Sequence, residues 1–341
     1  MSFIIIIALY FLTSFILKRT LGFFSSTALL DFPSKRSNHS IPKPKGAGLI
    51  LIPLLIFATL LVFFLENILN HHWVIIFGFC SILCFVSLLD DIKNISSKIR
   101  LTFQFFCVFS SLILFKDDIA LYSESQRLDF IFNNEYQNIP VYFLLFFIGL
   151  FWVWIINMFN FMDGMDGITI VQVASLALLS NVLALCGLIE SNFIYFSLIL
   201  LAIFISFYSV NKPPAKIFLG DVGSIPIGFL SGFIIIYNII KTQLILPYLI
   251  IIMYYLLDSI ITILIRLFNG RNIFKAHSEH FYQKLLRKGY SHSYVLKRII
   301  VVNLILLFLS FSSINYPLTS LTLSLLVTIT ILCFFNFRKS K

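Results

Sequence analysis

Long apolar runs separated by short polar connections follow one another along the whole chain. A helix needs about 20 mostly apolar residues to cross the hydrocarbon core of a bilayer, with a range of about 17–25. Eleven runs reach or approach this length, and each predicts one membrane-spanning helix. They lie at residues 2–17, 46–65, 73–89, 101–115, 140–157, 168–187, 192–210, 225–240, 243–265, 299–312 and 317–336.

The composition agrees with this pattern. The 341 residues are 59% hydrophobic and only 12% charged, whereas a soluble domain carries roughly 25% charged residues. The five cysteines fall inside apolar runs and are interpreted as small hydrophobic residues. Since no repeat or low-complexity linker divides the chain, we expect an all-α, polytopic membrane helix bundle forming one integral-membrane domain over residues 1–341.

The distribution of lysine and arginine predicts the orientation. One set of alternate connections, with the C-terminal tail, carries 22 of the 25 basic residues, and the other set has only Lys116, Arg127 and Lys241. Basic residues are enriched in cytoplasmic loops, so the N-terminus is expected outside and the C-terminus in the cytoplasm. The net charge of +10 then reflects topology and attraction to inner-leaflet lipids or phosphates, and nucleic-acid binding is excluded as its explanation.

Polar clusters gather in the predicted cytoplasmic connections, and the first is "LLDDIKN". Asp90 and Asp91 end the third apolar run, and in a continuous helix Asp90, Asn94 and Lys98 share one face. Two adjacent carboxylates at the hydrocarbon boundary are costly unless they are used. They suit a metal site or a general base, and the alternative is a solvated helix end.

The second cluster, "NMFNFMDGMDG", follows the fifth run. Asn157, Asn160, Asp163 and Asp166 recur at every third position, which keeps successive side chains near one face. A glycine follows each acid and lets a ligand approach the backbone. Ligands that are all oxygen suit Mg²⁺, with Mn²⁺ as the alternative ion. A polar turn between two spans is the simpler interpretation.

The third cluster, "FLGDVGS", places Asp221 between glycines just before the eighth run. The backbone N–H groups of residues 220–224 are expected to form an anion-binding nest, helped by the positive end of the following helix. The alternative is a glycine-rich turn with a helix cap at Ser224.

The fourth cluster, "AHSEHFYQKL", lies in the most basic connection. His277 and His280 are three positions apart and would share the face of a helix. A phosphate or nucleotide contact is favoured over a zinc pair, and a plain amphipathic helix is the remaining alternative. Asp258 and Arg266, eight positions apart near the cytoplasmic end of the ninth run, are either functional or structural charge partners.

"LLDD", "NxxNxxDGxDG", "FLGDxGS" and the histidine-containing loop, in this order, resemble the polyprenyl-phosphate N-acetylhexosamine-1-phosphate transferases of glycosyltransferase family 4. The resemblance extends over nearly the whole chain and includes "DFPSKRSNH" near the start. It implies an Mg²⁺-dependent transfer of a sugar-1-phosphate from a UDP-N-acetyl sugar to undecaprenyl phosphate, with release of UMP, at the cytoplasmic face of the bacterial inner membrane. It is compatible with a homodimer.

Carried onto this sequence, the resemblance implies roles for individual residues. Asp90, Asp91 and Asp163 are the expected catalytic residues, and Asp163 and Asp221 the expected metal ligands. The expected substrate-binding residues are Asn157, Asn160, Asp166, Lys98, His277 and His280.

The chain departs from the family pattern in its last motif. Many members have a His-x-His-His run, where this chain has "HSEHFYQKL". This form resembles the branch that initiates O-antigen or related glycans with 6-deoxy-N-acetylhexosamines. The main alternative function is a secondary transporter that uses intramembrane carboxylates, although such sites usually lie near the midplane. A CDP-alcohol phosphatidyltransferase is disfavoured because "DGMDGITI" does not continue as its motif requires.

Overall fold

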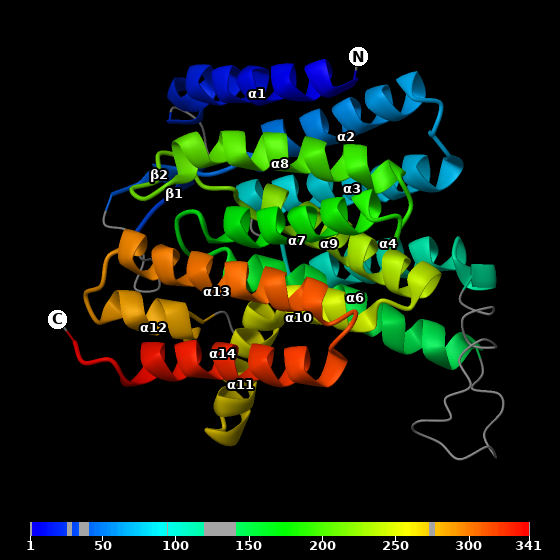
Figure 1. Cartoon of the computed structure of the whole chain (residues 1–341). Coiled ribbons are helices and arrows are strands. Elements are labelled where there is room, and N and C mark those ends of the chain that lie inside the picture. The colour runs from blue at the N-terminus through cyan, green and yellow to red at the C-terminus, as the bar shows by residue number, and fades with distance from the viewer. Residues whose placement is uncertain are drawn as a thin grey trace.

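The computed structural model describes residues 2–25, 29–33, 41–93, 95–118, 141–272 and 277–340. Nearly all regular structure in these residues is helical (Figure 1). The helices are α1 (Ser2–Ser25), α2 (Gly48–Leu65), α3 (His71–Lys93), α4 (Ser97–Ile113), α6 (Val141–Met162), α7 (Ile168–Leu185), α8 (Asn192–Asn211), α9 (Asp221–Thr242), α10 (Ile245–Ile251), α11 (Met253–Phe268), α12 (Phe281–Arg287), α13 (His292–Ser312) and α14 (Pro317–Phe337).

The predicted membrane bundle is confirmed. In the described part of the chain nine helices are long and apolar enough to cross a bilayer, and the bent pair α10–α11 makes a tenth span. The remaining predicted span corresponds to α4, which has 17 residues and so lies at the short end of the range. The chain is therefore a multi-pass membrane protein.

The ninth predicted span is not one straight helix. It is broken at Ile252, and α10 and α11 meet at an angle of 67°. In Figure 1, α11 leaves the common direction of the bundle and projects from one side. The hydrophobic run over 243–265 predicts membrane burial, but hydropathy contains no information about direction, so the bend was missed.

Helix α9 lies at the centre of the bundle, and 94% of its most apolar 18-residue stretch is buried. It packs against α2, α3 and α6. Membrane helices approach closely where small residues face one another, and α9 is rich in glycine and serine. One such approach is fixed by a hydrogen bond, because the indole N–H of Trp152 donates to the carbonyl of Phe229 at 2.9 Å.

The first turns of α2 and α9 touch through two glycines. A Cβ atom built on Gly48 would lie 2.4 Å from the Cα of Gly223, so neither position accepts a side chain without moving a helix. The N–H of Gly48 also donates to the carbonyl of Leu219 at 3.0 Å. The starts of these two helices are therefore held together by backbone contact.

A short pairing brings the early connection onto the same region. The strands β1 (Leu30–Asp31) and β2 (Lys43–Pro44) are antiparallel. Lys45 then pairs with Phe218, whose N–H donates to the carbonyl of Pro44 at 2.8 Å. In Figure 1, β1, β2, α12 and the C-terminal end gather at one end of the bundle, and the N-terminus lies at the other.

Candidate active site

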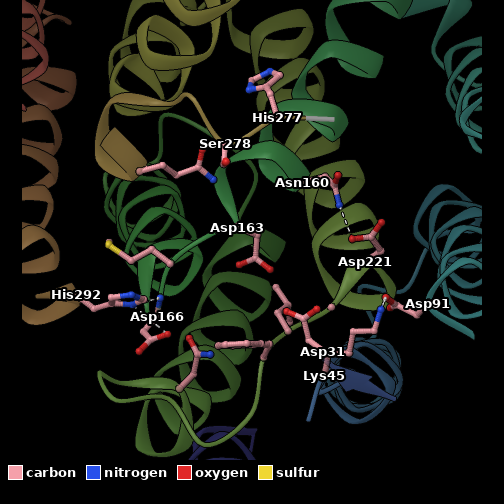
Figure 2. Close-up of a pocket in the computed structure, with 17 residues that line it drawn as sticks. Asp31, Lys45, Asp91, Asn160, Asp163, Asp166, Asp221, His277, Ser278 and His292 are labelled. Carbon is pink, nitrogen blue, oxygen red and sulfur yellow. Dashed lines mark hydrogen bonds and ion pairs between the residues drawn. The ribbon is translucent and has the colours of Figure 1, made fainter. Parts of the chain in front are cut away.

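A pocket of about 390 Å³ opens at the end of the bundle where β1, β2 and α12 lie. Figure 2 shows Asp163 near its centre, with Asp166 and His292 to one side and Asp91 and Asp221 to the other. Its polar lining comes from segments far apart in sequence: Asp31, Lys45, Asp91, Asn160, Asp163, Asp166, Asn211, Asp221, His277, Ser278, Gln283 and His292. The acidic clusters predicted to converge therefore do so.

The carboxylate of Asp91 lines the pocket at the end of α3 and is held on both oxygens. Lys45 lies 3.0 Å from one oxygen, and the N–H of Val222 donates to the other at 3.0 Å. Burial disfavours the charge of Lys45, but Asp91 outweighs it and raises the Lys45 pKa. Because Asp91 accepts from Val222, a protein carboxylate occupies part of the anion-binding nest expected at the start of α9.

Arg100 links the other acid of the pair to the start of α9. One nitrogen of its guanidinium lies 2.6 Å from Asp90 and 2.8 Å from Asp221. Asp90 itself does not line the pocket. The predicted partner Lys98 is exposed, because α3 ends at Lys93 and α4 begins anew at Ser97.

The shared face predicted for residues 90, 94 and 98 was therefore wrong. Asn94 lies outside the described residues. Ser96 caps the new helix by accepting from the N–H of Ile99, and this break turns Arg100 rather than Lys98 toward the acids.

The two asparagines of the second cluster have different partners. Asn160 lines the pocket and donates at 2.9 Å both to Asp221 and to the hydroxyl of Ser224. Asn157 lies outside the pocket lining and donates to Gln104 at 2.7 Å. The prediction of a common face fails for Asn157, because it lies deeper in α6 and faces Gln104 on α4, whereas the acids beyond Met162 sit in a turn.

Asp163 lines the pocket and is partly buried. Burial, with a smaller contribution from the negative charges of Asp221 and Asp91, raises the pKa of Asp163 to about 8 against the opposing effect of a hydrogen bond from Thr169. The hydroxyl of Thr169 donates to the carboxyl at 2.5 Å. The shift therefore comes mainly from removal of the carboxyl group from water, and the neighbouring acids add to it.

Asp166 and His292 form the opposite end of the pocket. The Nδ1 atom of His292 lies 3.2 Å from one carboxylate oxygen of Asp166, and the N–H of Ala215 donates to the other at 3.0 Å. Burial acts to raise the pKa of Asp166, but the two partners outweigh burial and leave that pKa below its usual value. No role was predicted for His292.

The histidine loop places only one of its two predicted residues in the pocket. His277 lines it, and burial, followed by the nearby His280 and Arg266, lowers the His277 pKa to about 4. His280 lies outside the pocket lining and contacts Asp258 at 3.0 Å through Nδ1. It precedes α12 as its N-cap, so the two histidines do not share a helical face.

Asp258 and Arg266 on α11 brace this loop and are not partners of each other in the structure. Asp258 is fully buried and also accepts from the N–H of Phe281 at 3.2 Å. Arg266 pairs with Glu279 and donates to the carbonyl of Asn272 at 2.6 Å. Of the two options left open, the geometry supports a structural role for both.

Gly164 is the position where a glycine was expected to admit a ligand. The group that approaches it is the side chain of Tyr282 on α12, whose hydroxyl accepts from the Gly164 N–H at 3.0 Å. A Cβ atom at Gly164 would clash with this hydroxyl. The glycine therefore allows α12 to dock against the acidic turn, next to the pocket that Gly164 also lines.

Sequence reasoning missed Lys45 and Asp31 as pocket residues and assigned no role to Arg100 or His292. Lys45 reaches Asp91 only because β2 runs on to pair with Phe218, and this pairing leaves no local sequence pattern. The Arg100 contact had a usable signal in the serine cap that restarts the helix.

The pocket residues suit a divalent ion by their chemistry. Asp91, Asp163 and Asp221 offer only carboxylate oxygens, which Mg²⁺ prefers. A divalent ion would neutralise the negative charges that these acids bring together. Among the described residues no three acidic, histidine or cysteine side chains are already grouped closely enough to hold a metal.

Comparison with known proteins identifies a matching family model and several relatives. The model of glycosyl transferase family 4 matches residues 73–239, which include both acidic pairs and Asp221. A phospho-N-acetylmuramoyl-pentapeptide-transferase of Rickettsia bellii is 26% identical over 326 residues, covering 87% of this chain and 86% of the relative.

Two further relatives are named as undecaprenyl-phosphate transferases. The undecaprenyl-phosphate alpha-N-acetylglucosaminyl 1-phosphate transferase of Thermotoga maritima is 30% identical over 216 residues, covering 63% of this chain and 59% of the relative. A probable undecaprenyl-phosphate N-acetylglucosaminyl 1-phosphate transferase of Bacillus subtilis is 25% identical over 316 residues, covering 89% and 82%. The motifs, the helical membrane fold and these relatives together show that the chain is similar to glycosyl transferase family 4.

Proposed function

We propose that this protein transfers an N-acetylated sugar-1-phosphate from a UDP-sugar to undecaprenyl phosphate and releases UMP. One observation carries the proposal: acids from α3, from the α6–α7 turn and from the start of α9 line a single pocket at one end of a membrane bundle. The family and the names of the relatives support the same reaction.

The proposed reaction is a direct displacement. An oxygen of the lipid phosphate forms a bond to the sugar-bearing phosphorus of the donor, and the bond from that phosphorus to the bridging oxygen breaks. UMP leaves with the bridging oxygen, and the sugar-1-phosphate stays on the lipid as a diphosphate. Nucleophile and donor are both negative, so catalysis requires positioning and neutralisation of charge.

Residues of the pocket divide between the two ends of the donor in this proposal. The uridine lies toward Asp166 and His292, and the diphosphate lies toward Asp163 and Asp221. Lys45, on the same side of the pocket as Asp221 (Figure 2), reduces the repulsion between the two phosphates. Asp90 and Asp91 act near the attacking lipid phosphate, and the pairing of Asp90 with Arg100 orients this end of the site.

A divalent ion belongs to the proposal. Asp163 and Asp221 would hold Mg²⁺, and the ion would supply charge neutralisation at the diphosphate. Chelation is expected to stop UMP release, and Mg²⁺ or Mn²⁺ to restore it.

We place the pocket at the cytoplasmic face of the bacterial inner membrane. The positive-inside tendency supports this orientation, since the connections predicted on this side from the sequence, with the C-terminal tail, carry 22 of the 25 basic residues. At this boundary a lipid phosphate and a water-soluble nucleotide sugar can meet. A secondary transporter would need its acids near the midplane, whereas these lie at helix ends.

The test is UMP release by the purified protein with undecaprenyl phosphate, Mg²⁺ and a panel of UDP-N-acetyl sugars that includes 6-deoxy sugars. We expect release that requires the lipid phosphate, with mass spectrometry detecting the lipid-linked product. Preference for a 6-deoxy sugar would support a role in O-antigen or related glycan initiation. Absence of UMP release with every sugar, together with sugar uptake into proteoliposomes, would overturn the proposal in favour of a transporter.

A further inference from the structure

A second, separate groove lies between the last two helices of the bundle. It has a volume of about 550 Å³ and lies along α13 and α14. Its lining residues are Arg298, Val302, Leu326, Val327, Thr330, Ile331 and Phe334. All are apolar except Arg298 and Thr330. Both helices are long and apolar enough to span the membrane, so this groove faces lipid chains.

A basic and aromatic cluster closes one end of this groove. We call it the Arg298–Arg338 cluster; it consists of Tyr290, Tyr294, Arg298, Phe334 and Arg338. The guanidinium carbons of Arg298 and Arg338 lie 5.7 Å and 5.3 Å from the centre of the same Phe334 ring. Arg298 also stacks over Tyr294 at 3.3 Å.

Contacts between the ends of the helices hold the cluster in place. The Nε atom of Arg338 donates to the hydroxyl of Tyr290 at 3.0 Å, and that hydroxyl donates to the carbonyl of Lys339 at 3.2 Å. The Tyr290 and Tyr294 rings lie 4.9 Å apart. Both guanidinium groups therefore lie against the Phe334 ring, and Arg338 is exposed at the surface.

The last part of the sequence carries basic side chains and no acidic ones. The sequence contains no aspartate or glutamate after Glu279. The basic residues of this last part are Lys284, Arg287, Lys288, Lys297, Arg298, Arg338, Lys339 and Lys341. Within the described residues neither Arg298 nor Arg338 forms an ion pair with a carboxylate. An anion from outside the chain is the natural counter-charge.

We propose that the groove between α13 and α14 binds an anionic phospholipid, with an acyl chain along the groove and the headgroup phosphate at the Arg298–Arg338 cluster. Guanidinium groups bind phosphate through paired hydrogen bonds. Basic pockets between membrane helices are typical headgroup sites, and tyrosines at the same level match the membrane interface. This site is independent of the proposed transferase reaction.

The bound lipid also has a route to the acidic pocket. Helix α13 begins at His292, which lines that pocket, and Arg298 lies six positions further along the same helix. A lipid at Arg298 therefore stabilises the helix that carries His292. Anionic lipid is expected to raise the thermal stability of the protein whether or not any substrate is present.

The test compares lipid binding by the full chain in detergent, using native mass spectrometry with phosphatidylglycerol and phosphatidylcholine. The wild type is expected to retain phosphatidylglycerol in preference to phosphatidylcholine. The double variant R298Q/R338Q should lose that preference, with apparent affinity for phosphatidylglycerol falling at least about tenfold. The matched control K18Q/R19Q removes two basic residues from α1 and should behave as the wild type.

A third variant tests the groove without changing any charge. Thr330→Trp fills the apolar channel and should reduce phosphatidylglycerol binding while the Arg298–Arg338 cluster stays intact. Equal binding of the two lipids by the wild type would overturn the proposal, as would unchanged binding by R298Q/R338Q. Conversion of a dimer to a monomer by Thr330→Trp in lipid-free detergent would assign the groove to a second copy of the chain and overturn it too.

Discussion

Arg100 on α4 donates a 2.8 Å hydrogen bond to Asp221, the first residue of α9, across 121 positions of sequence. The same nitrogen lies 2.6 Å from Asp90 at the end of α3. One cation thus joins three helices at the edge of the acidic pocket, and it keeps two like charges close together.

Replacement of Arg100 tests this junction. In Arg100→Gln the carboxylates of Asp90 and Asp221 lose their shared partner, so their mutual repulsion should displace Asp221 from Asn160. UMP release is expected to fall roughly tenfold to a hundredfold. The matched control is Lys93→Gln, which removes an exposed cation at the end of α3. Similar losses in both variants would show a general effect of charge.

The raised pKa of Asp163 predicts a pH-dependent stability. Folding raises this pKa from 3.8 to about 8, so the carboxyl stabilises the fold below the unfolded pKa and this contribution is lost as pH rises through the folded pKa. In chelator at about pH 9, Asp163→Asn should therefore unfold several degrees above the wild type, and near pH 4 the gap should close. A constant gap between the two proteins over this pH range would contradict the assignment.

Asp166 and His292 are expected to act on donor binding more than on the chemical step. His292→Phe removes the contact at 3.2 Å and leaves Asp166 with its backbone partner. The KM for the UDP-sugar should rise about tenfold with a smaller change in kcat, which is the signature of lost uniform binding. Steady-state kinetics decides this, and a fall in kcat at unchanged KM would contradict it.

Asp258 tests the brace between α11 and the histidine loop. Asp258→Ala removes the acceptor for the Phe281 N–H and leaves the buried His280 ring without its contact. The unfolding temperature should fall, and UMP release should fall with it because His277 and Ser278 are no longer held at the pocket. Thr262→Val removes only the 3.2 Å contact of Thr262 with Asp258 and should change both quantities little. Full activity in Asp258→Ala would exclude the brace.

The membrane bundle was predictable because hydropathy needs only local sequence. The convergence of Asp91, Asp163, Asp166 and Asp221 also followed, because all lie at helix ends on one side of the alternating topology. The exclusion of Asn157 was not predictable from its spacing, because the register depends on α6 ending at Met162.

The missed residues depend on contacts between distant segments. Lys45 enters the site through the pairing of residue 45 with Phe218, and no local pattern marks it. The bend at Ile252 likewise depends on what α10 and α11 pack against: α10 packs mainly against α13, whereas α11 packs mainly against α6 and α14. The hydropathy of the sequence alone assigns α10 and α11 to one span.

The contact between Gly48 and Gly223 has a consequence for any substitution screen. Gly48 follows Lys45 by three positions and Gly223 follows Asp221 by two. An alanine at Gly48 would push the starts of α2 and α9 apart. The ammonium group of Lys45 would then move away from the carboxylate of Asp91. In such a screen a substitution at Gly48 would lower activity as substitutions of the pocket carboxylates do. The glycine itself only keeps the starts of α2 and α9 at the distance that the pocket requires.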